Sequence, residues 1–236
     1  VAFAVFSIII LLLVILFAYI YMLIRNNRNE MRRLAYYDPL TGLYNKARFV
    51  EEAMSLLKQK SDYALVLLDV VNFKFVNELF GYEKGDVLLR HVAQVCMDAI
   101  DSTELCCRDN SDKFALLMSY GEKQALTDRL TKVMESISRC QLDPVQEYRI
   151  LCNCGVKTVE NYNGRVDFDV FWDRADLALK NAKGNQNDAI IFYGEELHER
   201  EVKRNEIERI MHTALSNREY RMYLQPKVDL ESGRVC

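Results

Sequence analysis

The stretch from Arg108 to Phe114 is the most informative part of this 236-residue chain for the chemistry that the chain could perform. It reads Arg-Asp-Asn-Ser-Asp-Lys-Phe and lies between two apolar segments, which predicts the turn of a β-hairpin. Carboxylates such as that of Asp112 are common ligands of the divalent cations that assist phosphoryl transfer. The adjacent Lys113 has an ordinary pKa of about 10.4, so it is charged, cannot ligate a metal and repels one. The chemistry of the turn therefore depends on the segments around it.

Three motifs around the turn have the residue types and spacing of one family. They are Asp38-Pro39-Leu40-Thr41-Gly42-Leu43-Tyr44-Asn45-Lys46, then Asp69-Val70-Val71-Asn72-Phe73-Lys74 with Asn77, then Gly81-Tyr82-Glu83-Lys84-Gly85-Asp86. Together they resemble the GGDEF family of bacterial diguanylate cyclase domains. In that register the Gly-Gly-Asp-Glu-Phe signature falls on Asn110, Ser111, Asp112, Lys113 and Phe114. The signature is degenerate in this chain.

The resemblance implies a reaction and a metal site. Two GTP-loaded domains face each other, each ribose 3′-hydroxyl attacks the α-phosphate of the opposite nucleotide, and cations held by carboxylates neutralise the charge. Asp69 and Asp112 match two metal positions of the family. The alternative for Asp69, a solvated carboxylate at a strand end, would suit an isolated Asp but is disfavoured by the matching motifs around it. Lys113 replaces the Glu used for metal binding and activation, Val71 replaces a second acid, and Asn110-Ser111 replaces two glycines that permit positive φ. We expect weakened binding of Mg²⁺ with GTP, a vestigial metal site and no catalytic residue at the Lys113 position.

The nucleotide pocket implied by the resemblance is better retained. Asn77 and Asp86 match positions that hydrogen-bond guanine, and Lys74 and Lys183 match positions near the phosphates. An Asp that accepts from the N1 and N2 hydrogens selects guanine over adenine. The alternative is that Asn77 is a helix-surface amide and that Asp86 caps a helix beginning with the next residue.

Two further family positions are altered. Asn187 occupies the place of an Arg that contacts phosphate, which predicts weaker triphosphate binding. The family's inhibitory Arg-x-x-Asp is replaced by Asp101-Ser102-Thr103-Glu104, and an acid cannot grip a phosphate, so product feedback is not expected there. We interpret Asp101 and Glu104 as solvated residues of a loop or helix end.

The elements that must position these residues alternate in type along the chain. Hydrophobic periodicity predicts helices over 47–60, 75–100 (broken near Gly81 and Gly85), 123–140 and 170–183, strands over 63–71, 148–158 and 189–193, and a hairpin of 104–109 with 114–119. This order predicts an α/β (α+β) fold with one mixed sheet flanked by helices, in residues 38–193. The resemblance implies that the fold is the nucleotidyl-cyclase-like one.

The N-terminal region predicts a membrane anchor. Residues 1–24 contain no charge and are rich in Ile, Leu, Val and Phe, which is long enough for one transmembrane helix, and the features of a cleaved signal peptide are absent. Arg25, Arg28, Arg32 and Arg33 follow, so the positive-inside rule places the later residues in the cytoplasm, at the inner membrane of a bacterium. Because the chain starts with Val within the apolar run, we expect a missing upstream region. Residues 25–37 predict a juxtamembrane helix that transmits movement or forms a homodimer contact, with a passive linker as the alternative.

The C-terminal region predicts a second domain. Residues 194–219 contain a charged linker helix over 197–217. The sequence from Tyr220 to Gly233 then resembles the first hairpin of an EAL domain, the cyclic-di-GMP phosphodiesterase family, and residues 220–236 would be a truncated EAL domain in cis. The Glu-Ala-Leu motif and the later metal ligands of that family are not in this chain.

Composition limits the remaining choices. The formal net charge is -3 and basic residues do not cluster outside 25–33, which gives no argument for nucleic-acid binding. The seven cysteines are odd in number and mostly lie in apolar segments, which predicts buried free thiols in a reducing compartment. Cys152 and Cys154 share one face of a predicted strand, but without a second pair core packing is favoured over a metal site.

These observations predict a membrane-anchored cyclic-di-GMP signalling protein whose inactive GGDEF domain binds GTP and regulates an EAL phosphodiesterase. Two alternatives stay open, namely a residual diguanylate cyclase and a purely structural coupling or dimerisation domain. GTP affinity separates the first reading from the third, and cyclic-di-GMP production separates the second from both.

Overall fold

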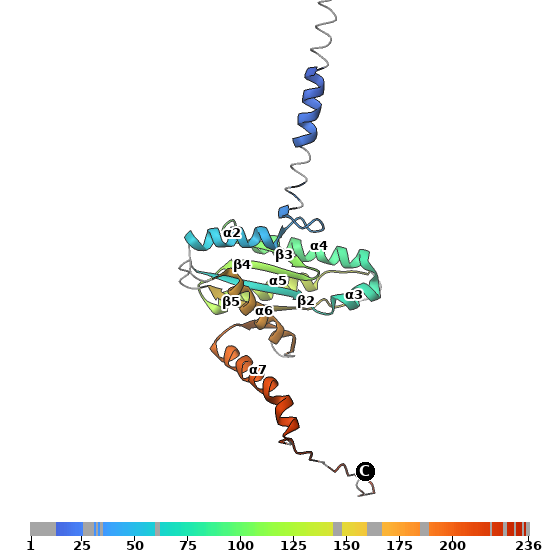
Figure 1. Ribbon diagram of the computed structural model, residues 1–236. Coiled ribbons are helices and arrows are strands. Elements are labelled where there is room, and N and C mark those ends of the chain that lie inside the picture. Colours follow the sequence, from blue (N-terminus) through green and yellow to red (C-terminus); the bar gives the residue numbers. More distant parts are fainter. Residues whose placement is uncertain are drawn as a thin grey trace, which may run out of the picture. The chain divides into compact units, whose positions relative to one another are not determined.

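The computed structural model describes residues 13–25, 31, 33, 35–59, 62–143, 148–159, 167–184, 189–217, 219–223, 226–228, 230–232 and 234. The chain divides into two units, Val1–Tyr193 and Gly194–Cys236. The first contains a mixed sheet with helices on both faces, as predicted (Figure 1).

Six strands form this sheet in the order β1-β3-β4-β2-β5-β6. They are β1 (Tyr44–Asn45), β2 (Tyr63–Val70), β3 (Leu105–Asn110), β4 (Lys113–Ser119), β5 (Cys152–Val159) and β6 (Ile190–Phe192). The central β2 is antiparallel to β4 and β5, whereas the edge strands β1 and β6 pair in parallel with β3 and β5. Every residue of β2 is buried, which explains why its sequence is almost continuously apolar.

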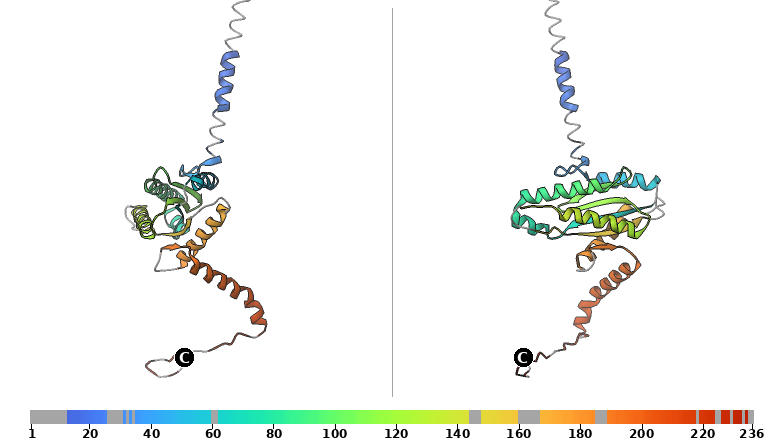
Figure 2. Two further views of the ribbon diagram at one scale, coloured as in Figure 1. Left: turned by 90° about the vertical axis from the view of Figure 1, so that its left-hand side faces the viewer. Right: turned by 180° about the vertical axis from the view of Figure 1, so that it is seen from behind.

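Five helices cover the two faces of the sheet. On one face lie α3 (Phe73–Phe80), α4 (Tyr82–Ala99) and α5 (Lys123–Ser138), and on the other lie α2 (Lys46–Gln59) and α6 (Phe168–Gly184) (Figures 1 and 2). Successive side chains of a strand point to opposite faces. The even-numbered residues of β2 therefore pack with the α3–α5 layer, and Tyr63, Leu65 and Leu67 pack with α2 and α6. The same alternation directs Asp69 to the face covered by α6.

One predicted feature of the helices is wrong. The helical segment breaks at Gly81, whose φ is +84°, but not at Gly85, which lies inside α4. Gly85 serves close packing, because a Cβ at this position would lie 1.9 Å from Asn77 Oδ1. The predicted strand from residue 148 also begins later, at Cys152. Cys152 and Cys154 are both buried in the core, and burial raises the pKa of the Cys152 thiol to about 12.

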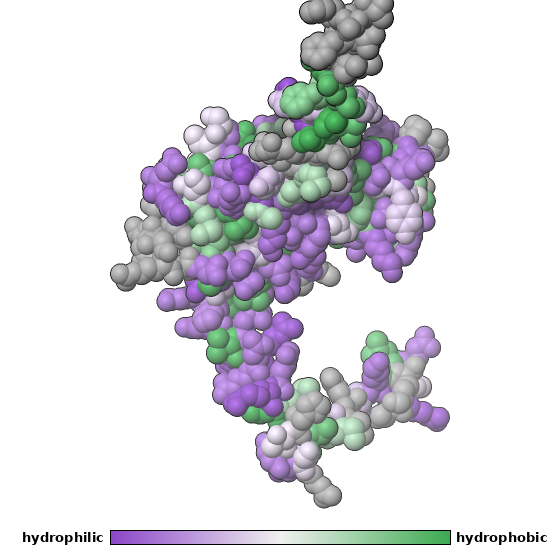
Figure 3. All heavy atoms as spheres, turned by 45° about the horizontal axis from the view of Figure 1, so that its top comes forward, coloured by the Kyte–Doolittle hydropathy of each residue, from purple (hydrophilic) through white to green (hydrophobic). Residues whose placement is uncertain are grey.

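The described N-terminal residues 13–25 are helical, with exposed hydrophobic side chains (Figure 3). No helix within the described ranges is both long enough and apolar enough to cross a bilayer. Residues 1–12 of the predicted span lie outside the described residues, as do 26–30, 32 and 34 of the predicted juxtamembrane helix.

The second unit contains α7 (Glu195–Ser216), which corresponds to the linker helix predicted over 197–217. The predicted hairpin over 220–233 includes residues 224, 225, 229 and 233, which lie outside the described residues. That hairpin stays a prediction.

Candidate functional site

Asp69 occupies the end of β2 where the site was predicted. Asp69 is paired in register with Lys113 of β4 and with Asn153 of β5, and only 3% of its surface is exposed to solvent. Burial raises the pKa of Asp69 and the carboxylate of Asp112 adds to this effect, while Lys183 and Lys113 oppose it. Asp69 is therefore a desolvated carboxylate, and the reading as a solvated strand-end residue is wrong.

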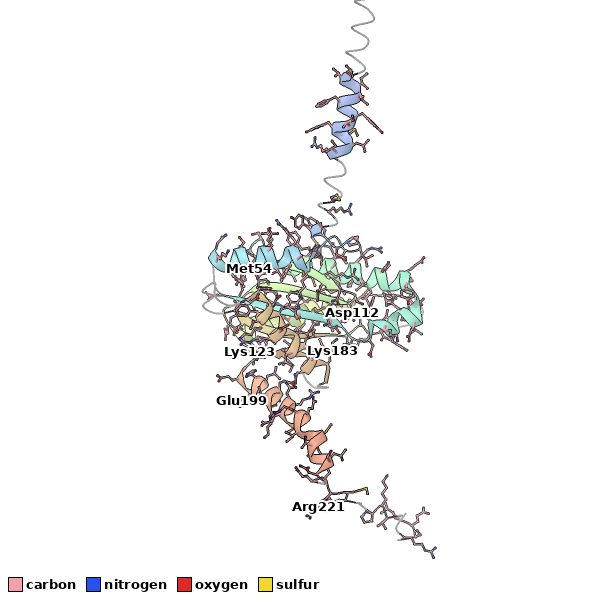
Figure 4. All side chains as sticks on the ribbon, viewed as in Figure 1. Met54, Asp112, Lys123, Lys183, Glu199 and Arg221 are labelled. Atoms are coloured by element: carbon pink, nitrogen blue, oxygen red, sulfur yellow. The ribbon has the colours of Figure 1, made fainter. Side chains whose placement is uncertain are left out.

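Lys183 is the direct partner of Asp69. Its Nζ lies 2.8 Å from Asp69 Oδ2, near the C-terminal end of α6. Figure 4 shows Lys183 and Asp112 toward the same end of the sheet. A lysine predicted to bind phosphate therefore forms an ion pair with an aspartate predicted to bind a metal.

Lys113 forms an ion pair with a carboxylate that was not among the predicted site residues. Its Nζ lies 3.0 Å from Oδ1 of Asp176 on α6, and Lys180 Nζ lies 2.8 Å from Oδ2 of the same Asp176. Burial opposes the charge of Lys113, but the hydrogen bond and attraction of Asp176, with further attraction from Asp69, raise its pKa above the ordinary value. Lys113 is therefore a firmly charged group within the site. Asp176 could have been noticed in the sequence as a carboxylate one turn before Lys180, in the predicted helix over 170–183 that also contains Lys183.

The hairpin turn is held by an arginine. Arg108 donates from Nε and Nη2 to the Ser111 carbonyl oxygen at 2.9 and 2.6 Å, and from Nη1 to Asp38 Oδ1 at 3.1 Å. Thr41 donates to the same Asp38 oxygen from its backbone N and its Oγ1. These contacts fix the turn to the segment that precedes β1. Arg108 and Asp38 were not predicted as partners, because 70 residues separate them.

The two residues in place of the signature glycines take different conformations. Ser111 has a φ of +44°, which lies in the left-handed region. Serine adopts this region less readily than asparagine, yet here Ser111 adopts it and Asn110 does not. Asn110 ends β3 and is exposed, and Phe114 is fully buried in the core. Lys113 and Asp112 are each partly buried beside this turn.

The two residues predicted to bind guanine, Asn77 and Asp86, lie on α3 and α4 respectively. Asn77 Oδ1 is buried and has no hydrogen-bond partner among the described residues. Asp86 lies inside α4, which begins at Tyr82, so it does not cap a helix and that alternative is wrong. Lys74, predicted to lie near the phosphates, has a 91% exposed side chain, and its Nζ lies 3.7 Å from Glu78 Oε1.

The segment before the hairpin corrects another interpretation. Asp101 is exposed as predicted, but Glu104 is buried. Arg129 of α5 donates to both Glu104 oxygens at 2.8 and 2.7 Å, and the backbone N–H groups of Ser119 and Asp101 also donate to them. Glu104 is therefore part of the core, and it is satisfied by four hydrogen bonds.

The donor set at the end of β2 does not fit a divalent cation well. Val71, in place of an acid, donates its backbone N–H to Leu151 and offers no carboxylate. Asp69 Oδ2 is taken by Lys183, and Lys113 adds a second ammonium group. Within the described part of the chain, no group of three or more His, Cys, Asp or Glu residues is placed to hold a metal ion. Asn187, the altered phosphate position, lies outside the described residues.

Comparisons with known proteins agree with this architecture. Residues 35–189 match the family model described as the diguanylate cyclase GGDEF domain. The chain is 25% identical over 215 residues to the bifunctional diguanylate cyclase/cyclic di-GMP phosphodiesterase MucR of Pseudomonas aeruginosa, covering 89% of this chain and 31% of that protein. It is 26% identical over 206 residues to the cyclic di-GMP phosphodiesterase PdeB of Shewanella oneidensis, covering 84% of this chain and 23% of that protein.

A solved structure shows the same fold. The coiled coil and GGDEF domain of DgcB from Caulobacter crescentus, in complex with c-di-GMP, superposes with a TM-score of 0.64 at 22% identity, over 74% of this chain and 94% of that one. The chain spans less than a third of the length of MucR or PdeB.

Proposed function

This chain belongs to the GGDEF family of diguanylate cyclase domains, and on this premise we propose that its GGDEF domain binds GTP without cyclising it and regulates a phosphodiesterase domain in the same polypeptide. Membership of the family makes the domain part of cyclic-di-GMP signalling. Three points are proposals: that the domain does not cyclise GTP, that it still binds GTP, and that it regulates a downstream phosphodiesterase domain.

The observation that supports loss of the reaction is the ion pair between Lys113 and Asp176. Phosphoryl transfer needs positively charged groups beside the phosphate oxygens, which are negative, and a group that assists deprotonation of the attacking hydroxyl. Lys113 is charged and hydrogen-bonded to a carboxylate at 3.0 Å, so it cannot accept that proton. The second ion pair, of Lys183 with Asp69, occupies the carboxylate that a metal would need.

Retention of the nucleotide is supported by the geometry between α3 and α4. The Asn77 amide carries a buried Oδ1 that lacks a partner among the described residues, and leaving a buried acceptor unpaired is unfavourable. Gly85 leaves the space that this amide occupies. Asp86 lies in the second turn of α4, is partly buried and does not cap the helix. An unpaired acceptor on α3 and an acid on α4 are residue types suited to the N–H donors of a guanine edge.

The partner and the anchor are also proposals. MucR and PdeB, which are named as having cyclic-di-GMP phosphodiesterase activity, extend well beyond the region that matches this chain. The sequence after α7 resembles the start of an EAL domain, and we place that domain in cis. Residues 1–24 would anchor the protein in the inner membrane with the GGDEF domain in the cytoplasm. A reporter fused after Tyr193 that is active only outside the membrane would contradict this topology.

The test of the nucleotide proposal uses the full chain, in detergent if its N-terminal region requires it. We expect no cyclic-di-GMP by mass spectrometry after incubation with GTP and Mg²⁺. In titration calorimetry, we expect GTP to bind about tenfold or more tightly than ATP, because the wrong base leaves buried polar groups unpaired. Asp86→Ala should abolish this preference, and Asp98→Ala, at an exposed position of the same helix, should preserve it.

Two outcomes would replace the proposal. Product formation that Asp69→Ala abolishes would favour a residual cyclase. If GTP gives neither heat nor a thermal shift while the protein is folded, the domain is a structural coupling or dimerisation unit.

A further inference from the structure

Lys113 presents a permanent positive charge at the position where a metal-binding acid is absent. It pairs in register with Asp69 across β4 and β2, and both side chains lie on the face covered by α6. The Lys113 ammonium group is thus built into the same part of the site as the two carboxylates that resemble metal ligands.

Asp176 holds this ammonium group without fully neutralising it. Asp176 is shared between Lys113 and Lys180, at 3.0 and 2.8 Å from its two oxygens, so the three groups together carry one net positive charge. An ammonium group has three N–H donors. Among the described residues, Lys113 donates one of these to Asp176 Oδ1, and its side chain is 32% exposed. It retains donors and solvent access for an anionic ligand.

Lys183 has the same properties on the neighbouring carboxylate. One donor is directed to Asp69, and the side chain is 42% exposed. A divalent cation that approached Asp69 would have to displace this hydrogen bond and enter the field of Lys113. A phosphate group would be repelled by the carboxylates of Asp69 and Asp112, but the ammonium groups of Lys113 and Lys183 are partly exposed and have N–H donors to spare for it.

We infer that Lys113, held by Asp176, takes the place of a divalent cation as the counter-charge of a bound nucleoside triphosphate, so that this domain binds GTP without Mg²⁺. The inference rests on the proposed GTP binding and specifies its chemistry: the ligand is the metal-free triphosphate. It also separates this domain from a weakened metal-dependent site, because such a site loses its ligand when the metal is removed.

The test measures GTP affinity by titration calorimetry with the full chain, in buffers that contain either Mg²⁺ or EDTA. We expect the two dissociation constants of the wild type to agree within about threefold. Lys113→Met removes the charge while keeping an unbranched side chain, and it should weaken binding in EDTA by about tenfold or more, as expected for a charge-assisted hydrogen bond. Lys58→Met is the matched control, since it removes an exposed lysine at the end of α2 and should leave the affinity unchanged.

The outcomes are distinguishable from those of the proposed function. Binding of GTP by the wild type with Mg²⁺ but not with EDTA would overturn this inference and leave the proposed function intact. Equal affinity of Lys113→Met and the wild type in EDTA would likewise overturn it and make the Lys113–Asp176 pair a structural contact alone. No binding in either buffer, with an unchanged thermal unfolding transition, would overturn both.

Discussion

Arg129→Ala should destabilise the domain more than its position on the surface of α5 suggests. The Glu104 side chain is fully buried, with 0% exposure, whereas that of Arg129 is 37% exposed. Removing Arg129 takes away two of the four hydrogen bonds to Glu104 and leaves a buried carboxylate with two backbone donors. It also removes the hydrogen bond from Arg129 Nη2 to the Ala99 carbonyl oxygen.

The magnitude follows from the burial of the two partners. Removing one partner of a fully buried ion pair costs about 3–5 kcal/mol. Because solvent screens more than a third of Arg129, we reduce this to about 2–3 kcal/mol in the free energy of unfolding. In a domain of this size, each 1 kcal/mol shifts the melting temperature by about 2–4 °C. The expected decrease in Tm is therefore about 4–12 °C.

The same pair predicts a pH dependence with a definite sign. Burial would raise the pKa of Glu104, but the hydrogen bonds from Arg129, Ser119 and Asp101 lower it below the ordinary value. A carboxylate with a lowered pKa in the folded state stabilises the protein above its unfolded pKa of about 4.3. This contribution is lost as the pH falls through the folded pKa. Arg129→Ala should remove it, so the destabilisation should be largest near neutral pH and should shrink in acid.

Thermal unfolding followed by circular dichroism, between pH 7 and the lowest pH at which the protein stays soluble, measures both effects. Lys132→Ala, at an exposed position on the same helix, is the control and should change Tm by no more than one or two degrees. A Tm for Arg129→Ala within two degrees of the wild type at neutral pH would refute the reasoning. A destabilisation that does not depend on pH would show that lost packing, and not the buried charge, is responsible.

Two further predictions concern backbone positions. Gly155→Ala should lower the free energy of unfolding by more than about 3 kcal/mol, because the new Cβ would lie 2.2 Å from the backbone N of Leu179. In the control Gly121→Ala the new Cβ meets open space, so this substitution should be tolerated. Soluble yield and Tm measure the difference between the two variants. Ser111→Gly should stabilise by about 0.5–1 kcal/mol, because it relieves the positive φ of +44° at a cost in unfolded-state entropy. Ser102→Gly, in a turn without positive φ, should be destabilising in the same denaturation assay, and a loss of stability in Ser111→Gly would contradict the strain argument.

The order and type of the helices and strands could be predicted from the sequence alone. The apolar run at residues 63–71 predicted a buried strand because a strand covered on both faces needs apolar residues at every position, and β2 has this environment. The break at Gly81 was also predictable, because its φ of +84° favours a residue without a Cβ. These features depend on local conformational preferences and on burial, which a single sequence records directly.

Tertiary structure decided which side chains meet. Lys113 contacts Asp176 across 63 positions of sequence, and Arg129 contacts Glu104 across 25, so no local spacing predicts either pair. Gly85 was interpreted as a helix break because glycine weakens helices, but the packing of Asn77 against it requires a residue without a Cβ inside α4. The burial of Glu104 could not be predicted either, because a charged residue in a loop is usually exposed to solvent. The desolvation of a carboxylate depends on the partners that surround it, and those partners come together only when the sheet and its helices have formed.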